Sequence, residues 1–161
     1  MTSDPRLRLL HDWLESRFAG RAFTLAPASA DASFRRYFRA TFADAGESLV
    51  AMDAPPDKED CRPFLGVARL FAAAGAHVPA VHAENLQDGF LLLEDLGVTT
   101  YLDRLDACGR DTAVADELYG AAIDTLVTIQ AASAPDRLPP YDDALLRREL
   151  ALFPDWYVAK H

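Results

Sequence analysis

The sequence predicts an α+β fold in which a five-stranded antiparallel sheet with accompanying helices comes first and a wholly helical segment follows. Residues 34–42 alternate strictly between two sets of side chains, and this period of two is typical of a half-buried strand. Four more short strand-like runs surround one helical run, with glycine or proline near their ends. Beyond Gly97 no strand-like run appears, so helices are expected there.

A helix is predicted to precede the sheet. Asp4 is a candidate N-cap and Pro5 suits the first helical position, while Gly20 ends the apolar periodicity. Residues 22–27 are the first predicted strand, antiparallel to residues 34–42 and then to residues 48–54. In the second strand, one face carries Phe34, Arg36, Phe38, Ala40 and Phe42, and the other carries Arg35, Tyr37, Arg39 and Thr41.

The sheet is predicted to continue after one helix, residues 61–74, which follows Pro55-Pro56. Its apolar side is expected to consist of Phe64, Val67, Ala68 and Phe71. Residues 80–84 are the fourth strand. A tight turn that ends at Gly89 leads into residues 90–93, which are apolar throughout and therefore expected to be buried on both faces.

Three helices are predicted in the second half. Thr99 or Thr100 caps a short helix that ends at Leu105, and Asp111 and Asp142 cap two longer ones. Pro154 is expected to break or restart the last helix. The helix after Asp111 carries an apolar stripe that we expect to face a core: Val114, Leu118, Ala122, Leu126 and Ile129.

The 161 residues suffice for one compact domain or two closely packed lobes. The formal net charge of −9 disfavours long-range attraction to nucleic acid or anionic lipid. Cys61 and Cys108 are far apart and form no C-x-x-C pattern, so neither a zinc site nor a disulfide is expected. No stretch suits a membrane span or a secretory signal, so we expect a cytoplasmic protein without a membrane partner.

This order of elements is the layout of a protein-kinase-like N-lobe that runs into an α-helical C-lobe. Residues 1–96 are then the nucleotide-binding N-lobe, and residues 97–161 are the hinge and the beginning of the C-lobe. The linker, residues 93–97, leaves a buried strand and offers unpaired backbone groups to adenine. A solvated corner is the alternative for its acidic pair. Similarly, the small residues 28–33 either let a phosphate approach the backbone or form the edge of a small sheet.

The chain resembles the aminoglycoside phosphotransferase superfamily over nearly its whole length. Within that superfamily it looks very like the bacterial kinases that phosphorylate N-acetylmuramate and N-acetylglucosamine at the anomeric hydroxyl in cell-wall recycling. The resemblance rests on residues 31–39 (DASFRRYFR), 51–56 (AMDAPP), 58–64 (KEDCRPF), 89–97 (GFLLLEDLG), 99–102 (TTYL), 138–141 (LPPY), 148–150 (REL) and 153–157 (FPDWY).

The resemblance implies ATP-dependent phosphoryl transfer to a small sugar, with magnesium. It places Ser33 and Phe34 in the loop over the phosphates and Met52 near the adenine or the α-phosphate. It also makes Leu93 the gatekeeper-like residue, with Glu94 and Leu96 giving backbone contacts at the hinge.

Two departures from this pattern matter. Protein kinases carry a lysine on the third strand, but residues 50–53 (VAMD) contain none, so we expect Arg35, Arg36 or Arg39 to supply the charge. Their alternative interpretation is surface arginines on an edge strand. The second departure is that no His-x-Asp segment with a following Asn is present, nor the downstream metal-binding Asp. The chain is therefore expected to be a fragment that binds nucleotide weakly and does not turn over.

The acceptor site is expected at the start of the C-lobe, where Glu149, Trp156 and Tyr157 are candidates, with helix packing as their alternative role. A metal site at His77 and His82 is disfavoured. Aminoglycoside, choline or homoserine are alternative acceptors, and a non-catalytic nucleotide-binding or partner-binding module is the alternative function. Apolar helix faces that no C-lobe covers are expected to favour self-association.

Overall fold

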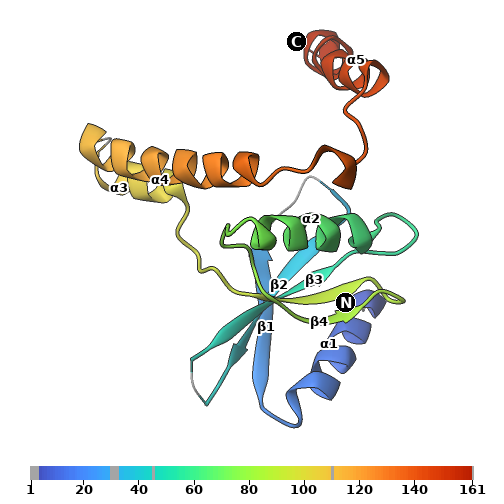
Figure 1. The fold of residues 1–161 in the computed structure, drawn as a ribbon. Coiled ribbons are helices and arrows are strands. Elements are labelled where there is room, and N and C mark those ends of the chain that lie inside the picture. Colours follow the sequence, from blue (N-terminus) through green and yellow to red (C-terminus); the bar gives the residue numbers. More distant parts are fainter. Residues whose placement is uncertain (1–3, 30–32, 45, 110, 161) are drawn as a thin grey trace.

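The computed structural model describes residues 4–29, 33–44, 46–109 and 111–160, and Figure 1 shows their fold. The strands are β1 (Phe23–Ser29), β2 (Arg36–Phe42), β3 (Ser48–Asp53), β4 (Val81–Asn85) and β5 (Phe90–Glu94). The helices are α1 (Pro5–Phe18), α2 (Cys61–Ala73), α3 (Tyr101–Ala107), α4 (Thr112–Ala131) and α5 (Asp143–Leu152), with a 3-10 turn η1 (Pro135–Arg137) and a π-helix η2 (Phe153–Val158). The predicted α+β class is confirmed.

The five strands form one sheet in the order β1-β2-β3-β5-β4, and every neighbouring pair is antiparallel. The predicted three-stranded start and the hairpin that turns at Gly89 are both confirmed. β3 and β5 lie in the middle of the sheet, and α2 joins β3 to the edge strand β4. This arrangement fits the N-lobe of a kinase-like fold.

The sheet has two covered faces, which we name after the helices that lie on them (Figure 1). On the α1 face, the core consists of Leu10, Trp13, Leu14, Phe38, Ala51, Phe90 and Leu92. On the α2 face, it consists of Met52, Ala54, Cys61, Leu65, Leu91 and Leu93. Consecutive residues of β5 therefore belong to different cores, which confirms that residues 90–93 are buried on both faces.

The second strand begins later than predicted. Phe34 is 63% exposed and lies outside β2, whose pairing with β3 ends at Arg36 opposite Asp53. The reason is that the N–H of Phe34 donates to the carboxylate of Glu59 and not to a neighbouring strand. The predicted alternation holds from Arg36 onward: Arg36 lies on the α1 side with the buried Phe38, Ala40 and Phe42, and Tyr37 lies on the α2 side. Residues 30–32 of the preceding small-residue loop lie outside the described residues.

The buried side of α2 is also different from the predicted one. Cys61 and Leu65 are buried there, whereas the predicted positions, Phe64, Val67, Ala68 and Phe71, are only half-buried. The helix lies on the sheet with Leu65 inside the α2-face core, and the predicted stripe is displaced around the helix from that contact. An apolar stripe read from sequence gives the width of a buried side but not its centre.

The predicted caps of the helical segment are confirmed at Thr100, Asp111 and Asp142, each of which accepts a backbone N–H in the first turn. Pro154 lies where the last helix changes type. α5 ends at Leu152, and the π-helix η2 follows directly with Pro154 in its first turn, where a missing N–H donor is tolerated. Of the two expected outcomes, the structure therefore shows a restart and not a break.

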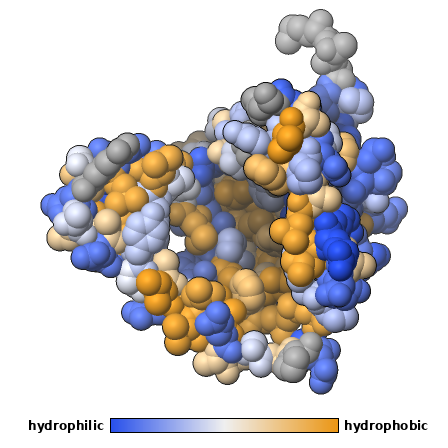
Figure 2. All heavy atoms as spheres, turned by 90° about the horizontal axis from the view of Figure 1, so that it is seen from above, coloured by the Kyte–Doolittle hydropathy of each residue, from blue (hydrophilic) through white to orange (hydrophobic). Residues whose placement is uncertain are grey.

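The stripe on α4 does not face a core in the described part of the chain, because Ala122 and Leu126 are exposed and the other three positions are only half-buried. On the face seen in Figure 2, hydrophobic side chains gather around a hollow. Exposed apolar residues of the helical segment include Tyr119, Ile123, Leu126, Val127, Leu146, Leu150, Phe153, Trp156 and Tyr157. No helix in the described ranges is both long enough and apolar enough to cross a bilayer.

A buried carboxylate ties α1 to the sheet. Asp53, at the end of β3, is fully buried, and its two carboxylate oxygens accept hydrogen bonds from Arg6 of α1 and Arg36 of β2. Arg36 also donates to Asp4, the N-cap of α1, and Arg6 donates to the carbonyl of Asp88 at 2.7 Å. A buried carboxylate needs such partners, because an unpaired one is costly. The network fixes where α1 starts against the strands.

Gly89 is a position that only glycine suits. Its φ is +75°, and an added Cβ would lie 1.9 Å from the carbonyl oxygen of Ala54. We expect Gly89→Ala to lower the free energy of unfolding by about 1 to 3 kcal/mol, because alanine disfavours this backbone angle and its Cβ would collide with the carbonyl of Ala54. Urea denaturation would measure this change.

The matched control is Gly66→Ala in α2, where no heavy atom lies within 4 Å of the added Cβ. We expect this variant to be more stable by about 0.5 to 1 kcal/mol, because alanine favours a helix over glycine. Equal effects of the two substitutions would contradict the structural account of Gly89.

Candidate functional site

The α2 face of the middle strands carries two rows of side chains, which include Met52 and Leu93, the two strand residues that the resemblance associates with a nucleotide. One row is Tyr37, Met52 and Leu91, and the next is Arg39, Val50 and Leu93, with strand partners directly opposite each other. Met52 and Leu93 thus lie on the same face in adjacent strands, as expected for one site. Because Met52 and Leu93 are both buried, they form the floor of the candidate site and not its exposed surface.

The residues before β2, Ser33 to Arg35, form a loop that we call the phosphate-side loop, because the resemblance places Ser33 and Phe34 over the phosphates. The Oγ of Ser33 accepts the N–H of Arg35 at 3.1 Å, which bends this loop tightly. Glu59, just before α2, accepts both the N–H of Phe34 and a guanidinium N–H of Arg35, each at 3.3 Å. Burial opposes the charge of Arg35, but its partners Tyr37 and Glu59 raise its pKa overall. One loop therefore presents a backbone donor and a cation side by side.

The three candidate arginines do not lie on one face. Arg36 is on the α1 face, in the network of Asp53 and Asp4, where the hydrogen bond that Arg36 donates to Asp4 is the first cause of its raised pKa. Arg39 lies in the same row as Leu93 on the opposite face. The structure brings Arg35 and Arg39 to the side of Met52 and leaves Arg36 behind the sheet.

Glu94 fastens the end of β5 to the segment before β4. Its N–H donates to the carbonyl of Ala80 at 2.8 Å, and its carboxylate accepts the N–H of Ala80 at 3.0 Å. The hydrogen bond from the N–H of Ala80 to the carboxylate is the main cause of the lowered pKa of Glu94, and His77 contributes less. The N–H of Glu94 is occupied in this way, so a hinge contact from this residue falls to its carbonyl oxygen. Leu96 is exposed at the next step of the linker.

Asp95 locks the linker to the sheet. Its carboxylate, only 5% exposed, accepts hydrogen bonds from Arg39 of β2, from Ser48 of β3 at 2.6 Å and from the N–H of Gly97 at 2.9 Å. Arg39 donates further to the carbonyl of Gly97 at 3.1 Å. These donors, with Arg39 foremost, hold the pKa of Asp95 far below its ordinary value. Asp95 is therefore not a solvated corner residue.

The candidate acceptor residues lie apart from this site. Glu149 is on α5, and Trp156 and Tyr157 are on η2, all exposed. Tyr157 stacks on Phe153 with ring centroids 5.2 Å apart, and Lys160 lies 5.1 Å from the ring centre of Trp156. Figure 1 shows α5 projecting away from the sheet, beyond α4. The described chain does not bring these residues together with Met52 or Leu93.

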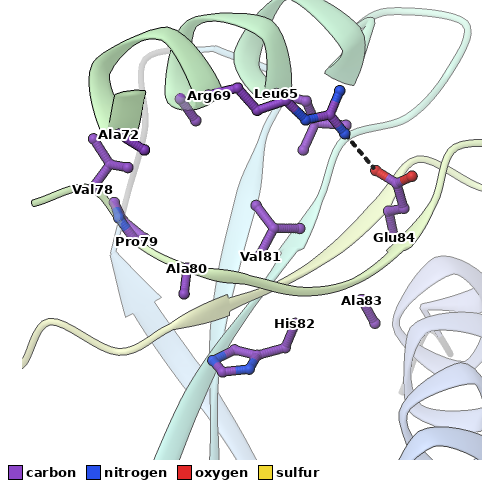
Figure 3. A pocket seen from close by; sticks show the side chains of 11 residues that line it. Leu65, Arg69, Ala72, Val78, Pro79, Ala80, Val81, His82, Ala83 and Glu84 are labelled. Carbon is purple, nitrogen blue, oxygen red and sulfur yellow. Dashed lines mark ion pairs between the residues drawn. The ribbon is translucent and has the colours of Figure 1, made fainter. Parts of the chain in front are cut away.

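A groove of about 530 Å³ lies between α2 and the edge strand β4. Leu65, Ala72, Val78 and Val81 give it apolar walls, and the ion pair of Arg69 and Glu84 crosses its rim (Figure 3). Because none of the residues predicted to bind nucleotide lines this groove, it does not belong to the candidate site.

One group of side chains in the described ranges can offer three metal-ligand atoms within 4.8 Å of one another, namely His11, Asp12 and Glu15 on α1. This group lies on α1, which packs on the opposite face of the sheet from the two rows of the α2 face. Near Met52 and Arg35, the described carboxylates of Glu59 and Asp95 are already engaged by arginines. The residues that surround the candidate site therefore do not fit a magnesium site by themselves.

The geometry agrees with comparisons to known proteins. A family model described as phosphotransferase enzyme family matches residues 24–161, and the chain belongs to this family. Several relatives are named as amino-sugar kinases. The N-acetylmuramate/N-acetylglucosamine kinase of Pseudomonas aeruginosa is 50% identical over 100% of this chain and 48% of its own length.

Two further relatives carry the same name. The kinase of Pseudomonas putida is 48% identical over 98% of this chain and 47% of its own length, and that of Neisseria meningitidis serogroup B is 46% identical over 94% and 44%. The chain thus spans about half the length of the curated relatives it matches. In general, membership of a kinase family implies the use of ATP and a divalent metal.

Sequence reasoning missed three carboxylates that pair with the arginines around β2: Glu59 and Asp95 beside the candidate site, and Asp53 on the α1 face. The predicted strand, residues 34–42, carries three arginines, and a half-buried arginine needs a partner. The sequence shows that such partners must exist, but pairing over 17 to 56 positions is set by the fold.

The lock at Asp95 predicts a specific pH dependence. Because folding lowers the pKa of Asp95 from an ordinary value of 3.8, its stabilisation is present above about pH 4 and is lost as pH falls toward the folded-state pKa. We expect Asp95→Asn to cost about 1.5 to 3 kcal/mol at pH 7 and progressively less below pH 4. Urea denaturation between pH 3 and pH 7 would measure the difference.

Asp57→Asn is the matched control, because this side chain is 74% exposed and its ion pair in the described chain is a loose one, 3.8 Å from Lys58. It should change stability by less than about 0.5 kcal/mol. A deficit of Asp95→Asn that stays constant down to pH 3 would argue against the lock.

Proposed function

We propose that this chain is the ATP-binding lobe and first helices of a cytoplasmic kinase that phosphorylates N-acetylmuramate or N-acetylglucosamine at the anomeric hydroxyl. The observation that carries the proposal is that the whole chain is 50% identical to a protein named N-acetylmuramate/N-acetylglucosamine kinase. The sheet order and the inserted α2 support it independently. Residues 1–96 are the N-lobe in this proposal, and residues 97–161 are the hinge and the beginning of the C-lobe.

In this proposal, the adenine lies on the α2 face beside the linker. Leu93 limits the depth of the site, and the carbonyl of Glu94 and the N–H of Leu96 contact the adenine edge. Met52 forms the floor, while the loop of Ser33 and Phe34 covers the phosphates. The close rows of β3 and β5 support this placement. Such a lobe contributes positioning and charge, which are the main sources of rate in phosphoryl transfer.

The phosphate charge is assigned to Arg35, with Arg39 as the linker lock and Arg36 as the tether of α1. Arg35 is the candidate that adjoins the phosphate-side loop, and it replaces the lysine absent from β3. Magnesium is part of the proposed reaction, and its ligands are expected outside the residues of this lobe. The metal would neutralise phosphate charge.

The acceptor is proposed to contact Glu149, Trp156 and Tyr157, since an aromatic ring suits the apolar face of a sugar. The exposure of these side chains leaves them available for that role. Aminoglycosides, choline and homoserine remain alternative acceptors. A net charge of −9 argues against nucleic acid as a partner.

A non-catalytic nucleotide-binding or partner-binding module is the second candidate function. It is favoured by one observation: the sequence has no His-x-Asp segment followed by Asn that would supply a catalytic base. A coupled phosphorylation assay with either amino sugar should therefore give no turnover for this chain. Turnover would contradict the assignment of the base and metal ligands to residues outside it.

Nucleotide binding by single arginine variants tests the assignment of the charge. We expect Arg35→Ala to weaken ATP binding about ten-fold, because it removes the cation that adjoins the loop. Arg36→Ala should change binding less than three-fold, since Arg36 lies behind the sheet. Isothermal titration calorimetry with ATP and magnesium would measure both.

Arg62→Ala is the control, because this exposed arginine at the start of α2 forms its side-chain ion pair in the described chain with the neighbouring Asp60. If Arg36→Ala and Arg35→Ala weaken ATP binding equally, the positive charge acts from either face of the sheet, which would contradict its assignment to Arg35. An unaltered affinity in Arg35→Ala would refute the assignment.

We also propose that the exposed apolar sides of α4 and α5 associate with a second copy of this chain. Contiguous exposed apolar patches favour association. Light scattering should show a mass that rises with protein concentration, and Leu126→Glu with Leu150→Glu should return it to the monomer value. The matched control is Arg148→Glu on the same helix as Leu150, and a concentration-independent monomer mass would contradict the proposal.

A further inference from the structure

Glu59 occupies a set of donors that suits a phosphate group. Its Oε1 accepts the backbone N–H of Phe34, and its Oε2 accepts a guanidinium N–H of Arg35, both at 3.3 Å. A backbone N–H beside an arginine fork is a common way to hold an anionic oxygen group. In this structure, a carboxylate of the protein holds that place.

The contact between Arg35 and Glu59 is the loosest of the arginine–carboxylate contacts along this strand. Charge-assisted hydrogen bonds usually measure about 2.7 to 2.9 Å. Arg36 reaches Asp53 through two nitrogen atoms, one at 3.0 Å, and Arg39 reaches Asp95 through two, one at 3.0 Å. Arg35 reaches Glu59 through one nitrogen atom, at 3.3 Å. This is therefore the arginine that can exchange partners at the lowest cost.

The corner between β3 and α2 fixes the position of Glu59. Its backbone N–H donates to the carbonyl of Pro55 at 2.9 Å, and the next residue, Asp60, caps α2. The side chains of Glu59 and Arg35 are 17% and 27% exposed, so a displaced carboxylate has solvent beside it. The backbone can stay in place while the side chain turns away.

We infer that Glu59 is a built-in competitor for the phosphates of the nucleotide. It holds Phe34 and Arg35 in the free protein, and a phosphate oxygen of a nucleoside triphosphate replaces its carboxylate at both donors. This inference rests on the proposed function, because it takes the loop of Ser33 and Phe34 as the phosphate-binding loop. Its consequence is unusual for an ion-pair partner: the removal of Glu59's charge tightens binding.

Calorimetric titration of the full chain with ATP and, separately, with inorganic tripolyphosphate tests this inference. We expect Glu59→Gln to tighten the binding of both ligands by about three- to ten-fold, because the competing charge is gone. With Arg35→Ala already present, Glu59→Gln should tighten binding less than it does in the unchanged chain, since the N–H of Phe34 is then the one donor of this pair that Glu59 withholds. Thermal unfolding without ligand checks that each variant is folded.

Asp57→Asn is the matched control for charge, because it removes the same negative charge two residues away, where the contact in the described chain is Lys58. It should change either affinity less than two-fold. Equal tightening in Asp57→Asn and Glu59→Gln would reduce the effect to long-range charge and overturn the inference. So would unchanged or weaker binding in Glu59→Gln, or no binding in any variant.

The two ligands separate this inference from the proposed function. If Glu59→Gln tightens tripolyphosphate while ATP binds no better than tripolyphosphate, the competition is real and the adenine site is wrong. If ATP binds better than tripolyphosphate but Glu59→Gln changes neither affinity, the nucleotide site stands and the role of Glu59 fails.

Discussion

The pairing of each arginine around β2 with a carboxylate is the constraint on which the rest of the structure depends. The alternation of the strand sends Arg36 to the α1 face and Arg39 to the α2 face, and each meets a carboxylate that is almost or fully buried. Asp53 then fixes α1, and Asp95 fixes the linker. Because a buried carboxylate without a cation is costly, these pairs hold the helix, the sheet and the linker in one arrangement.

This division of charges also organises the proposed site. The face that carries Met52 and Leu93 keeps one loosely held arginine, Arg35, while Arg36 is committed to structure on the other face. A strand that looks uniformly basic in sequence is thus two different surfaces. The match to a phosphotransferase family and the identity of about 50% to named sugar kinases agree with such a lobe.

Much of the fold could be predicted from local signals. Asp4, Thr100, Asp111 and Asp142 cap helices as their side chains suggest, and the period of two in β2 assigns its faces correctly from Arg36 onward. The failures are non-local. The centre of the buried side of α2 depends on how the helix lies over β3 and β5, and the fate of the α4 stripe depends on what covers it. Likewise, no local pattern reveals that Asp95 meets Arg39 across 56 positions.

The position of Asp95 decides where the chain is able to bend. Since its carboxylate joins the linker to two strands at once, and Gly97 is held at both its N–H and its carbonyl, the segment up to Gly97 must move together with the sheet. The exposed Val98 is the first residue past these restraints. Any swing of the helical segment against the strands would therefore pivot after Gly97, and the linker edge at which we propose that adenine binds would keep its shape.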